Sequence, residues 1–204
     1  MIHGIDLFHD DSMPDLIGYD FLIHKATQGG NFVDGECQGR IAQARDAGLV
    51  VGYYHFLTTD AIPDEQFAHF MDTAQPEPGD ILALDFEDDG TWSGMSASEL
   101  ADIADEFLYS ITIEATRNRW LLYCDMTTYS TIVSPFKVPQ QDGLWIAHPG
   151  AEPAIQHVIW QDTTHPVDQD TAKFSTRADM ALWADAERPA TQSGEQGFLL
   201  ANGD

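Results

Sequence analysis

Short apolar runs alternate with helix-periodic segments over the first 125 residues. Each run contains four to eight apolar and β-branched residues between turn residues, which predicts buried strands. The segments between them carry apolar residues every three or four positions, which predicts helices. Strands are expected at 2–7, 21–27, 49–56, 81–85 and 120–124, and helices at 36–48, 63–74 and 96–117. This alternation indicates a parallel sheet covered by helices.

The rhythm changes after the fifth strand. Strands are predicted at 143–148 and 157–161 with no clear helix between them, then a short strand or turn at 164–170 and a helix at 177–186. We therefore predict an α/β fold, a single irregular (β/α)-barrel of the TIM type, about (β/α)5(β)3, with helices missing in the last third. The predicted barrel domain spans 1–186, and residues 187–204 are expected to form a C-terminal tail.

Length and charge narrow the possible functions. The 204 residues suit one domain, and we expect a monomer. The net charge of -25 opposes binding to nucleic acid or to anionic membranes, and no apolar run reaches the length of a membrane span. Cys37 and Cys124 lie far apart and are expected to be reduced thiols. The amino-terminal residues show no secretory signal, so we expect synthesis in the cytoplasm without a signal peptide.

Two acids follow the predicted strand at 81–85. Asp85 and Glu87 are two residues apart, so their side chains should point into the same opening. Two such carboxyl groups with different proton affinities can cleave a glycosidic bond. An isolated D-x-E more often closes a strand and starts a solvated turn. However, Asp6 and Asp168 are also expected at the carboxyl ends of strands, where barrel enzymes place their chemistry.

Several segments together resemble glycoside hydrolase family 25, the Chalaropsis-type lysozymes that include phage endolysins. The matching segments, in the order of the family, are Gly4-Ile5-Asp6, Phe21 to Gly29, Gly52 to Phe56, Leu84 to Glu87, Leu144 to Ala147, Trp160-Gln161 and Val167-Asp168. The resemblance implies an N-acetylmuramidase that acts on peptidoglycan with retention of anomeric configuration and needs no cofactor.

The resemblance also implies roles for the four acids. Glu87 matches the general acid/base, and Asp85 matches the second carboxylate, either a nucleophile or the group that orients the substrate N-acetyl group. Asp6 and Asp168 match the outer acids of the site. Departures from the family pattern lie nearby: Leu7 to Asp10 lack its usual serine, and Gln28 stands where an acid is frequent.

Aromatic residues at predicted strand ends are candidates for stacking on sugar rings. The candidate substrate-binding residues are Tyr54, Tyr123, Trp145 and Trp160. Packing in the core is the equally frequent role for any one of them. His55 is expected to be structural, Lys25 is expected to pair with nearby acids, and the histidine spacing predicts no metal site.

Other functions remain open from the residues alone. A family 18 chitinase or endoglucosaminidase would need a further acid at Ala83, and a phosphodiesterase barrel would use the acids as metal ligands. A catalytically silent glycan-binding barrel is also consistent with the pattern. The family resemblance favours an enzyme that acts on the cell wall after release or export by another route.

Overall fold

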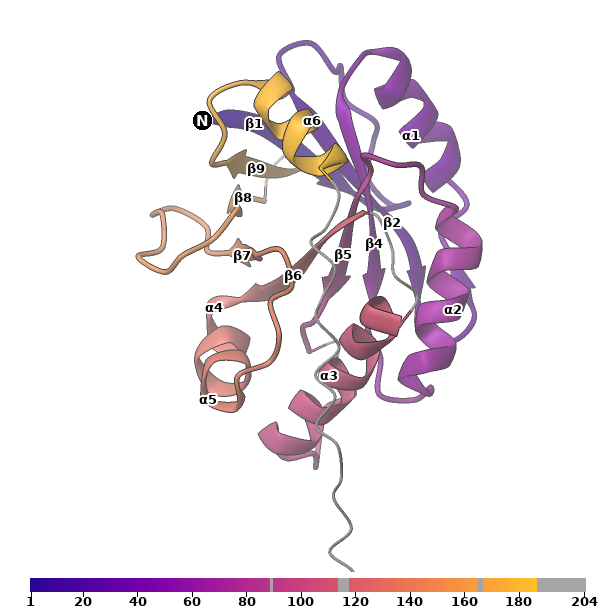
Figure 1. Ribbon diagram of the computed structural model, residues 1–204, viewed down its shortest axis with the longest axis vertical. Helices are drawn as coiled ribbons and strands as arrows, with labels where there is room; N and C mark the ends of the chain where they lie inside the picture. Colours follow the sequence, from indigo (N-terminus) through magenta and orange to yellow (C-terminus); the bar gives the residue numbers. More distant parts are fainter. Residues whose placement is uncertain (89, 114–117, 165–166, 187–204) are drawn as a thin grey trace, which may run out of the picture.

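A computed structural model describes residues 1–88, 90–113, 118–164 and 167–186. Eight of its strands close into a barrel, in the order β1-β9-β8-β7-β6-β5-β4-β2 with β2 paired back to β1 (Figure 1). The barrel strands are β1 (Ile2–Leu7), β2 (Phe21–Gln28), β4 (Val50–Phe56), β5 (Ile81–Asp85), β6 (Arg119–Asp125), β7 (Leu144–Ala147), β8 (Ile159–Thr163) and β9 (Asp168–Ala172). The predicted irregular TIM-type barrel is confirmed.

Strand direction is uniform except at β9. Neighbours from β1 through β8 are parallel, whereas β9 is antiparallel to both β8 and β1. The expectation that Asp168 ends its strand is therefore wrong, because Asp168 begins β9. The reversed strand still brings its amino end to the mouth where the parallel strands finish. A two-residue strand, β3 (Phe32–Val33), pairs with the end of β2 outside the ring.

Three helices cover the barrel between its first strands. They are α1 (Cys37–Asp46), α2 (Pro63–Ala74) and α3 (Ala97–Ile113). Each follows its predicted segment: α1 ends before Gly48, which has a φ of +75°, and a capping box between Ser96 and Glu99 precedes α3. The β1–β2 connection contains no helix, so the first β-α unit lacks one.

A short helical segment after β6 was not predicted. It consists of α4 (Met126–Thr128), the π-helical turn η1 (Tyr129–Val133) and α5 (Ser134–Phe136). Its sequence is poor in helix-forming residues, because it contains Thr, Ser, Ile, Val and a proline. Asp125 nevertheless starts it, since its side chain accepts a hydrogen bond from the Thr128 amide at 2.6 Å.

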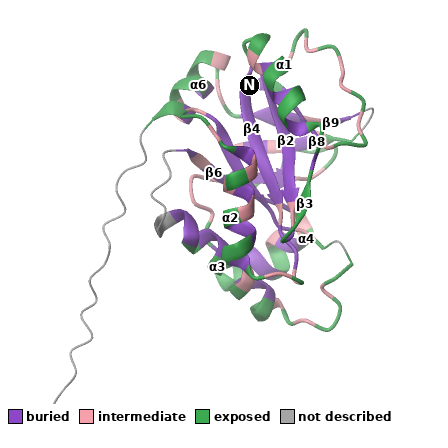
Figure 2. Ribbon diagram, turned by 90° about the vertical axis from the view of Figure 1, so that its right-hand side faces the viewer, coloured by how far each residue is buried: buried purple, intermediate pink, exposed green. Residues whose placement is uncertain are grey.

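The strands separate two apolar layers because their side chains alternate between the faces of the sheet. On β5, Leu82 and Leu84 pack outward with the helices, whereas Ile81 and Ala83 fill the barrel. Figure 2 shows the buried strands enclosed by helices whose outer faces are exposed. The same alternation, continued along the strand, directs Asp85 into the barrel.

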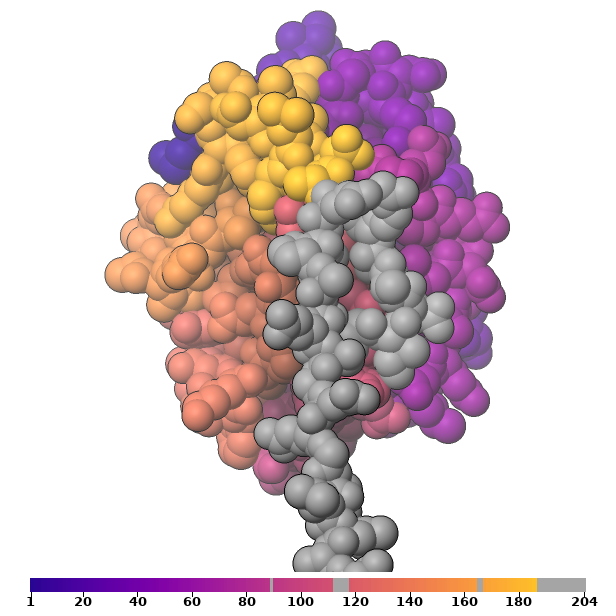
Figure 3. Space-filling model, in the orientation of Figure 1, coloured from indigo at the N-terminus to yellow at the C-terminus, as the bar shows by residue number. Residues whose placement is uncertain are grey.

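The last described helix, α6 (Arg177–Asp185), closes one end of the barrel. Its buried Met180 and Ala184 belong to the apolar group inside the barrel. Figure 1 shows α6 at the end opposite the arrowheads of β4 and β5, and Figure 3 shows its yellow surface beside the amino-terminal segments. The open end is therefore the carboxyl end of the parallel strands. The predicted tail, 187–204, lies outside the described residues.

No helix within 1–88, 90–113, 118–164 and 167–186 is long and apolar enough to cross a membrane.

Candidate active site

The open end of the barrel contains a pocket with a volume of about 190 Å³. Its walls come from the loop after β1 and from strands on every side of the ring. The lining residues are Asp6, Phe8, Lys25, Tyr54, Phe56, Asp85, Glu87, Tyr123, Trp145 and Asp168. The structure thus brings together all four acids that the sequence singled out.

Asp85 and Glu87 reach the pocket because the alternation of β5 continues past its end. Phe86 between them is buried on the outer side of the barrel, and its amide donates to the Tyr123 carbonyl at 2.9 Å. Asp85 is 5% exposed, and its Oδ1 has no hydrogen-bond partner among the described residues. Glu87 lies nearer the opening and is partly exposed. The deeper carboxyl group therefore offers a free acceptor atom to a ligand.

Burial disfavours the charged forms of both carboxyl groups. The pKa of Glu87 is raised to about 6 by burial, and then by the charges of Asp125 and Asp168. Burial and the charge of Glu87 also hold the pKa of Asp85 well above its ordinary value. Glu87 therefore retains its proton at a mildly acidic pH, as a general acid must.

Lys25 supplies positive charge to the acidic pocket. The side chain is 8% exposed, Nζ donates to Gln28 Oε1 at 2.6 Å, and the ammonium lies 4.7 Å from the centre of the Phe56 ring. Its charge lowers the pKa of both Asp85 and Glu87, although less than burial raises it. Gln28, a departure from the family pattern, thus holds this lysine in the pocket.

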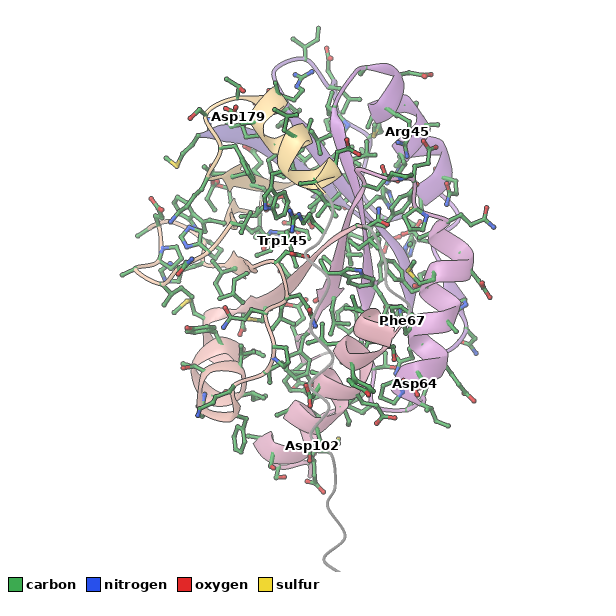
Figure 4. The ribbon with its side chains drawn as sticks, viewed as in Figure 1. Arg45, Asp64, Phe67, Asp102, Trp145 and Asp179 are labelled. Carbon is green, nitrogen blue, oxygen red and sulfur yellow. The ribbon has the colours of Figure 1, made fainter. Side chains whose placement is uncertain are left out.

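Three of the four predicted aromatic residues line the pocket. The centres of the Trp145 and Tyr123 rings are 4.8 Å apart, and Tyr54 contacts Trp145 edge to face at 6.3 Å. Figure 4 places Trp145 at the centre of the molecule among the strands. Trp160 differs, because it packs with the outer apolar layer and its Nε1 donates to the His148 carbonyl. Only the first three therefore face the acids.

Two polar residues beneath the pocket were not identified from the sequence. Gln161 Nε2 donates to Asp6 Oδ2 at 2.9 Å, and its Oε1 accepts from the Tyr123 hydroxyl at 3.1 Å. Asp170 Oδ1 accepts from Trp145 Nε1 at 2.8 Å and is 1% exposed. The sequence did contain a signal for both residues. Gln161 is two positions after Ile159 on β8, and Asp170 is two positions after Asp168 on β9, so each side chain points inward as its neighbour does.

Hydrogen bonds to the loop after β1 position Phe8 at the pocket. Arg40, from α1, donates to the carbonyls of Phe8 and Asp11 at 2.8 and 2.9 Å, and the His9 amide donates to Asp34 at 2.8 Å. Arg40 is 8% exposed, so these bonds are shielded from water. The loop is thus fixed by the helix that follows the next strand.

His55 lies away from the pocket on the outer side of the barrel. Its ring stacks on Phe107 with centres 5.2 Å apart, and its nitrogens contact Thr27 and Gln66 at 2.8 and 3.2 Å. Burial lowers the pKa of His55 to about 3, so the ring is neutral. Within the described part of the chain, no group of three or more His, Cys, Asp or Glu side chains could hold a metal ion.

Comparisons with known proteins find one matching family model and solved structures of the same fold. Residues 11–171 match the model of glycosyl hydrolases family 25. A muramidase from Acremonium alcalophilum has a TM-score of 0.78 and 20% identity, over 91% of this chain and 99% of that one. A lysozyme from Streptomyces coelicolor has a TM-score of 0.77 and 19% identity, over 90% and 97%.

A phage protein shares the same fold. The catalytic domain of endolysin ply40, from bacteriophage P40 of Listeria monocytogenes, has a TM-score of 0.67 and 17% identity, over 89% of this chain and 97% of that one. A comparison with curated sequences finds no match. At these identities the structures establish the fold, whereas the family model covers most of the 204 residues. The chain therefore belongs to glycosyl hydrolases family 25.

Proposed function

We propose that this glycoside hydrolase is an N-acetylmuramidase that cuts the β-1,4 bond between N-acetylmuramic acid and N-acetylglucosamine in peptidoglycan, with retention. The observation that carries the proposal is the pair Asp85 and Glu87 at the barrel mouth, with the pKa of Glu87 raised to about 6. Family membership and neighbours named muramidase and lysozyme support the substrate class. Membership of family 25 replaces the family 18 alternative.

Glu87 is the proposed general acid and base. Its position nearer the opening suits contact with the glycosidic oxygen, to which it would donate its proton as the bond breaks. The same group, now ionised, would then take a proton from the water that completes hydrolysis, as retention requires. Burial and the neighbouring anions support the first step because they keep the proton on Glu87 until it is needed.

Asp85 is the proposed second carboxylate. Its free, buried Oδ1 would either attack the anomeric carbon or accept a hydrogen bond from the substrate N-acetyl N–H. Both routes use the ionised form of Asp85, which burial and the charge of Glu87 oppose and the charge of Lys25 favours. Trapping of a sugar–Asp85 ester by a fluorinated substrate would identify the first route, and an oxazoline intermediate would identify the second.

Tyr54, Tyr123 and Trp145 form the proposed sugar-binding wall, and Asp6 and Asp168 are the proposed outer acids of the site. Anions around the pocket would stabilise the positive charge that develops on the sugar ring. Trp160 is not part of this wall, because its ring packs outside the barrel. We further propose that the protein acts as a monomer on glycan strands of the cell wall.

The test is the release of new reducing ends from purified peptidoglycan by the wild type, Glu87→Gln and Asp85→Asn. Loss of the acid should reduce turnover by about 10² to 10⁴-fold. Glu106→Gln is the matched control, because it makes the same chemical change on the exposed face of α3. It should retain the wild-type rate.

Circular dichroism would establish that each variant is folded. A folded Glu87→Gln protein with the wild-type rate would contradict the assignment of the acid. A wild type that binds peptidoglycan without releasing ends would support the silent binding barrel instead.

A further inference from the structure

Three acids from two neighbouring strands share the interior face of the barrel. Asp6 on β1 lies opposite Asp168 on β9, and Gly4 lies opposite Asp170 in the same antiparallel register. Residues two apart on a strand point the same way, so Asp170 faces the interior directly below Asp168 and diagonally across from Asp6. A Cβ at Gly4 would clash with the Phe21 ring, so that ring occupies the space opposite Asp170.

One oxygen atom of the Asp6 and Asp170 carboxyl groups is buried without a hydrogen-bond donor among the described residues. Gln161 donates to Asp6 Oδ2, and Trp145 donates to Asp170 Oδ1. Asp170 Oδ2 is fully buried and receives no hydrogen bond from an N–H or hydroxyl group of the described residues. The Asp6 and Asp170 carboxyl groups nevertheless lie on the same face of neighbouring strands, where a side-chain hydrogen bond between them would shift the pKa of each. Two carboxyl groups can form such a bond only if one carries a proton.

We propose that Asp6 and Asp170 share one proton in a hydrogen bond beneath the active site, and that Asp170 is thereby the positioning residue that holds Asp6 at the pocket wall. The proton satisfies the buried Oδ2 atom and reduces the charge of the pair from two to one. Trp145 and Gln161 fix the two outer oxygens of the pair, so neither carboxyl group can turn away.

The surrounding charges favour retention of this proton. Burial and then the charge of Asp168 raise the pKa of Asp6 to about 8. Burial, and then the charge of Asp6, hold the pKa of Asp170 well above its ordinary value. The titratable and charged groups near the pair, from the loop after β1 and from β2, β4, β5, β6 and β9, are Asp11, Lys25, Tyr54, Asp85, Glu87, Tyr123 and Asp168. Lys25 is the one cation among these groups.

The shared proton makes stability depend on pH in a defined direction. The unfolded chain releases this proton above its ordinary pKa of 3.8, whereas burial and the neighbouring anions in the folded protein raise the pKa of Asp6 to about 8 and hold the pKa of Asp170 well above its ordinary value. The folded state therefore loses stability relative to the unfolded state as the pH rises from about 4 to about 8. Above that range the pair is doubly charged, and its anions repel each other under the pocket.

The experiment is infrared difference spectroscopy of the full chain between pH 5 and 9. The wild type should show the carbonyl stretch of a buried protonated carboxyl group, retained through neutral pH and lost only at alkaline pH. Asp170→Asn should lose this band and stay folded, because its amide can accept from Trp145 and donate to Asp6. Asp6→Asn should lose the same band, and the exposed Asp105→Asn should retain it.

Turnover of peptidoglycan is the second measurement, and only this measurement rests on the proposed function. Asp170→Ala leaves Asp6 without its partner and should lower kcat/KM about tenfold or more, whereas Asp170→Asn should recover most of that loss. A wild type with no such band above pH 5, or a band unchanged in Asp170→Asn, would overturn the shared proton. Equal activities of the Ala and Asn variants would overturn the positioning role. An inactive wild type that shows the band would contradict only the muramidase proposal.

Discussion

Replacement of Asp125 by asparagine tests the electrostatic control of the proposed acid. Asp125 ends β6, and its charge is the second-largest cause, after burial, of the raised pKa of Glu87. Asparagine removes this charge but can still cap the helical segment that Asp125 starts through its bond to the Thr128 amide. The substitution should therefore lower the pKa of Glu87 without unfolding α4.

The size of the pKa shift of Glu87 sets an upper limit on the loss of activity. Glu87 has a pKa of about 6 in place of the ordinary 4.5, which corresponds to about 2 kcal/mol in favour of its protonated form. At pH 7 a group with a pKa of 6 is about 9% protonated, and one with a pKa of 4.5 is about 0.3% protonated. Complete loss of the shift would thus lower kcat/KM about thirtyfold at pH 7, but less than about twofold at pH 4.5.

The assay is kcat/KM against pH on soluble peptidoglycan fragments. The charge of Asp125 is one of three causes that raise the pKa of Glu87, and Asp125→Asn removes it. The alkaline limb of the variant's pH profile should therefore move to lower pH, while the loss of kcat/KM at pH 7 stays below thirtyfold. Asp105→Asn on the exposed face of α3 changes the net charge equally and should leave the limb in place. An equal loss of activity at every pH, or an alkaline limb that does not move, would contradict the electrostatic effect of Asp125 on Glu87.

Three further changes test packing and positioning. Phe107→Ala removes a ring stacked on His55 and should cost about 3–5 kcal/mol in the free energy of unfolding, measured with urea; a loss below 1 kcal/mol would contradict its core role. Ser96→Ala breaks the capping box and should cost about 1 kcal/mol by the same measurement, whereas no change would show that the box contributes nothing. Arg40→Met frees the loop that carries Phe8 and should raise KM more than it lowers kcat; an unchanged KM would exclude this positioning.

The barrel could be predicted because its strands are apolar and its turns are marked. The run Ile81–Asp85 is buried throughout, and the helix at 63–74 starts at a proline and buries Phe67 and Phe70, as the pattern indicates. The direction of β9 could not be predicted, since a short polar strand carries the same alternation in either direction. The segment after β6 was missed because tertiary packing overrides its weak helix propensity.

That the four acids would meet at one pocket could be predicted, but the direction of the strand that carries Asp168 and the residues beneath the pocket could not. Asp85 and Glu87 are visible as charges at the end of an apolar strand, and Asp6 follows the same pattern. Asp170 resembles any other polar residue of a short strand, and its role depends on contacts with Asp6 and Trp145 that are far away in sequence. Trp160 was grouped with the sugar-binding residues because the register that turns its ring outward depends on β7 and β9.

Mass spectrometry of peptidoglycan digests would identify the bond that the protein cuts and the role of Glu87 in cutting it. Digests made with the wild type and with Glu87→Gln would be reduced with borohydride to mark each new chain end. We expect muropeptides that end in reduced muramic acid, produced by the wild type and absent from the Glu87→Gln digest. Reduced glucosamine ends would contradict the muramidase assignment, and the same reduced muramic acid products from a folded Glu87→Gln protein would contradict the role of Glu87.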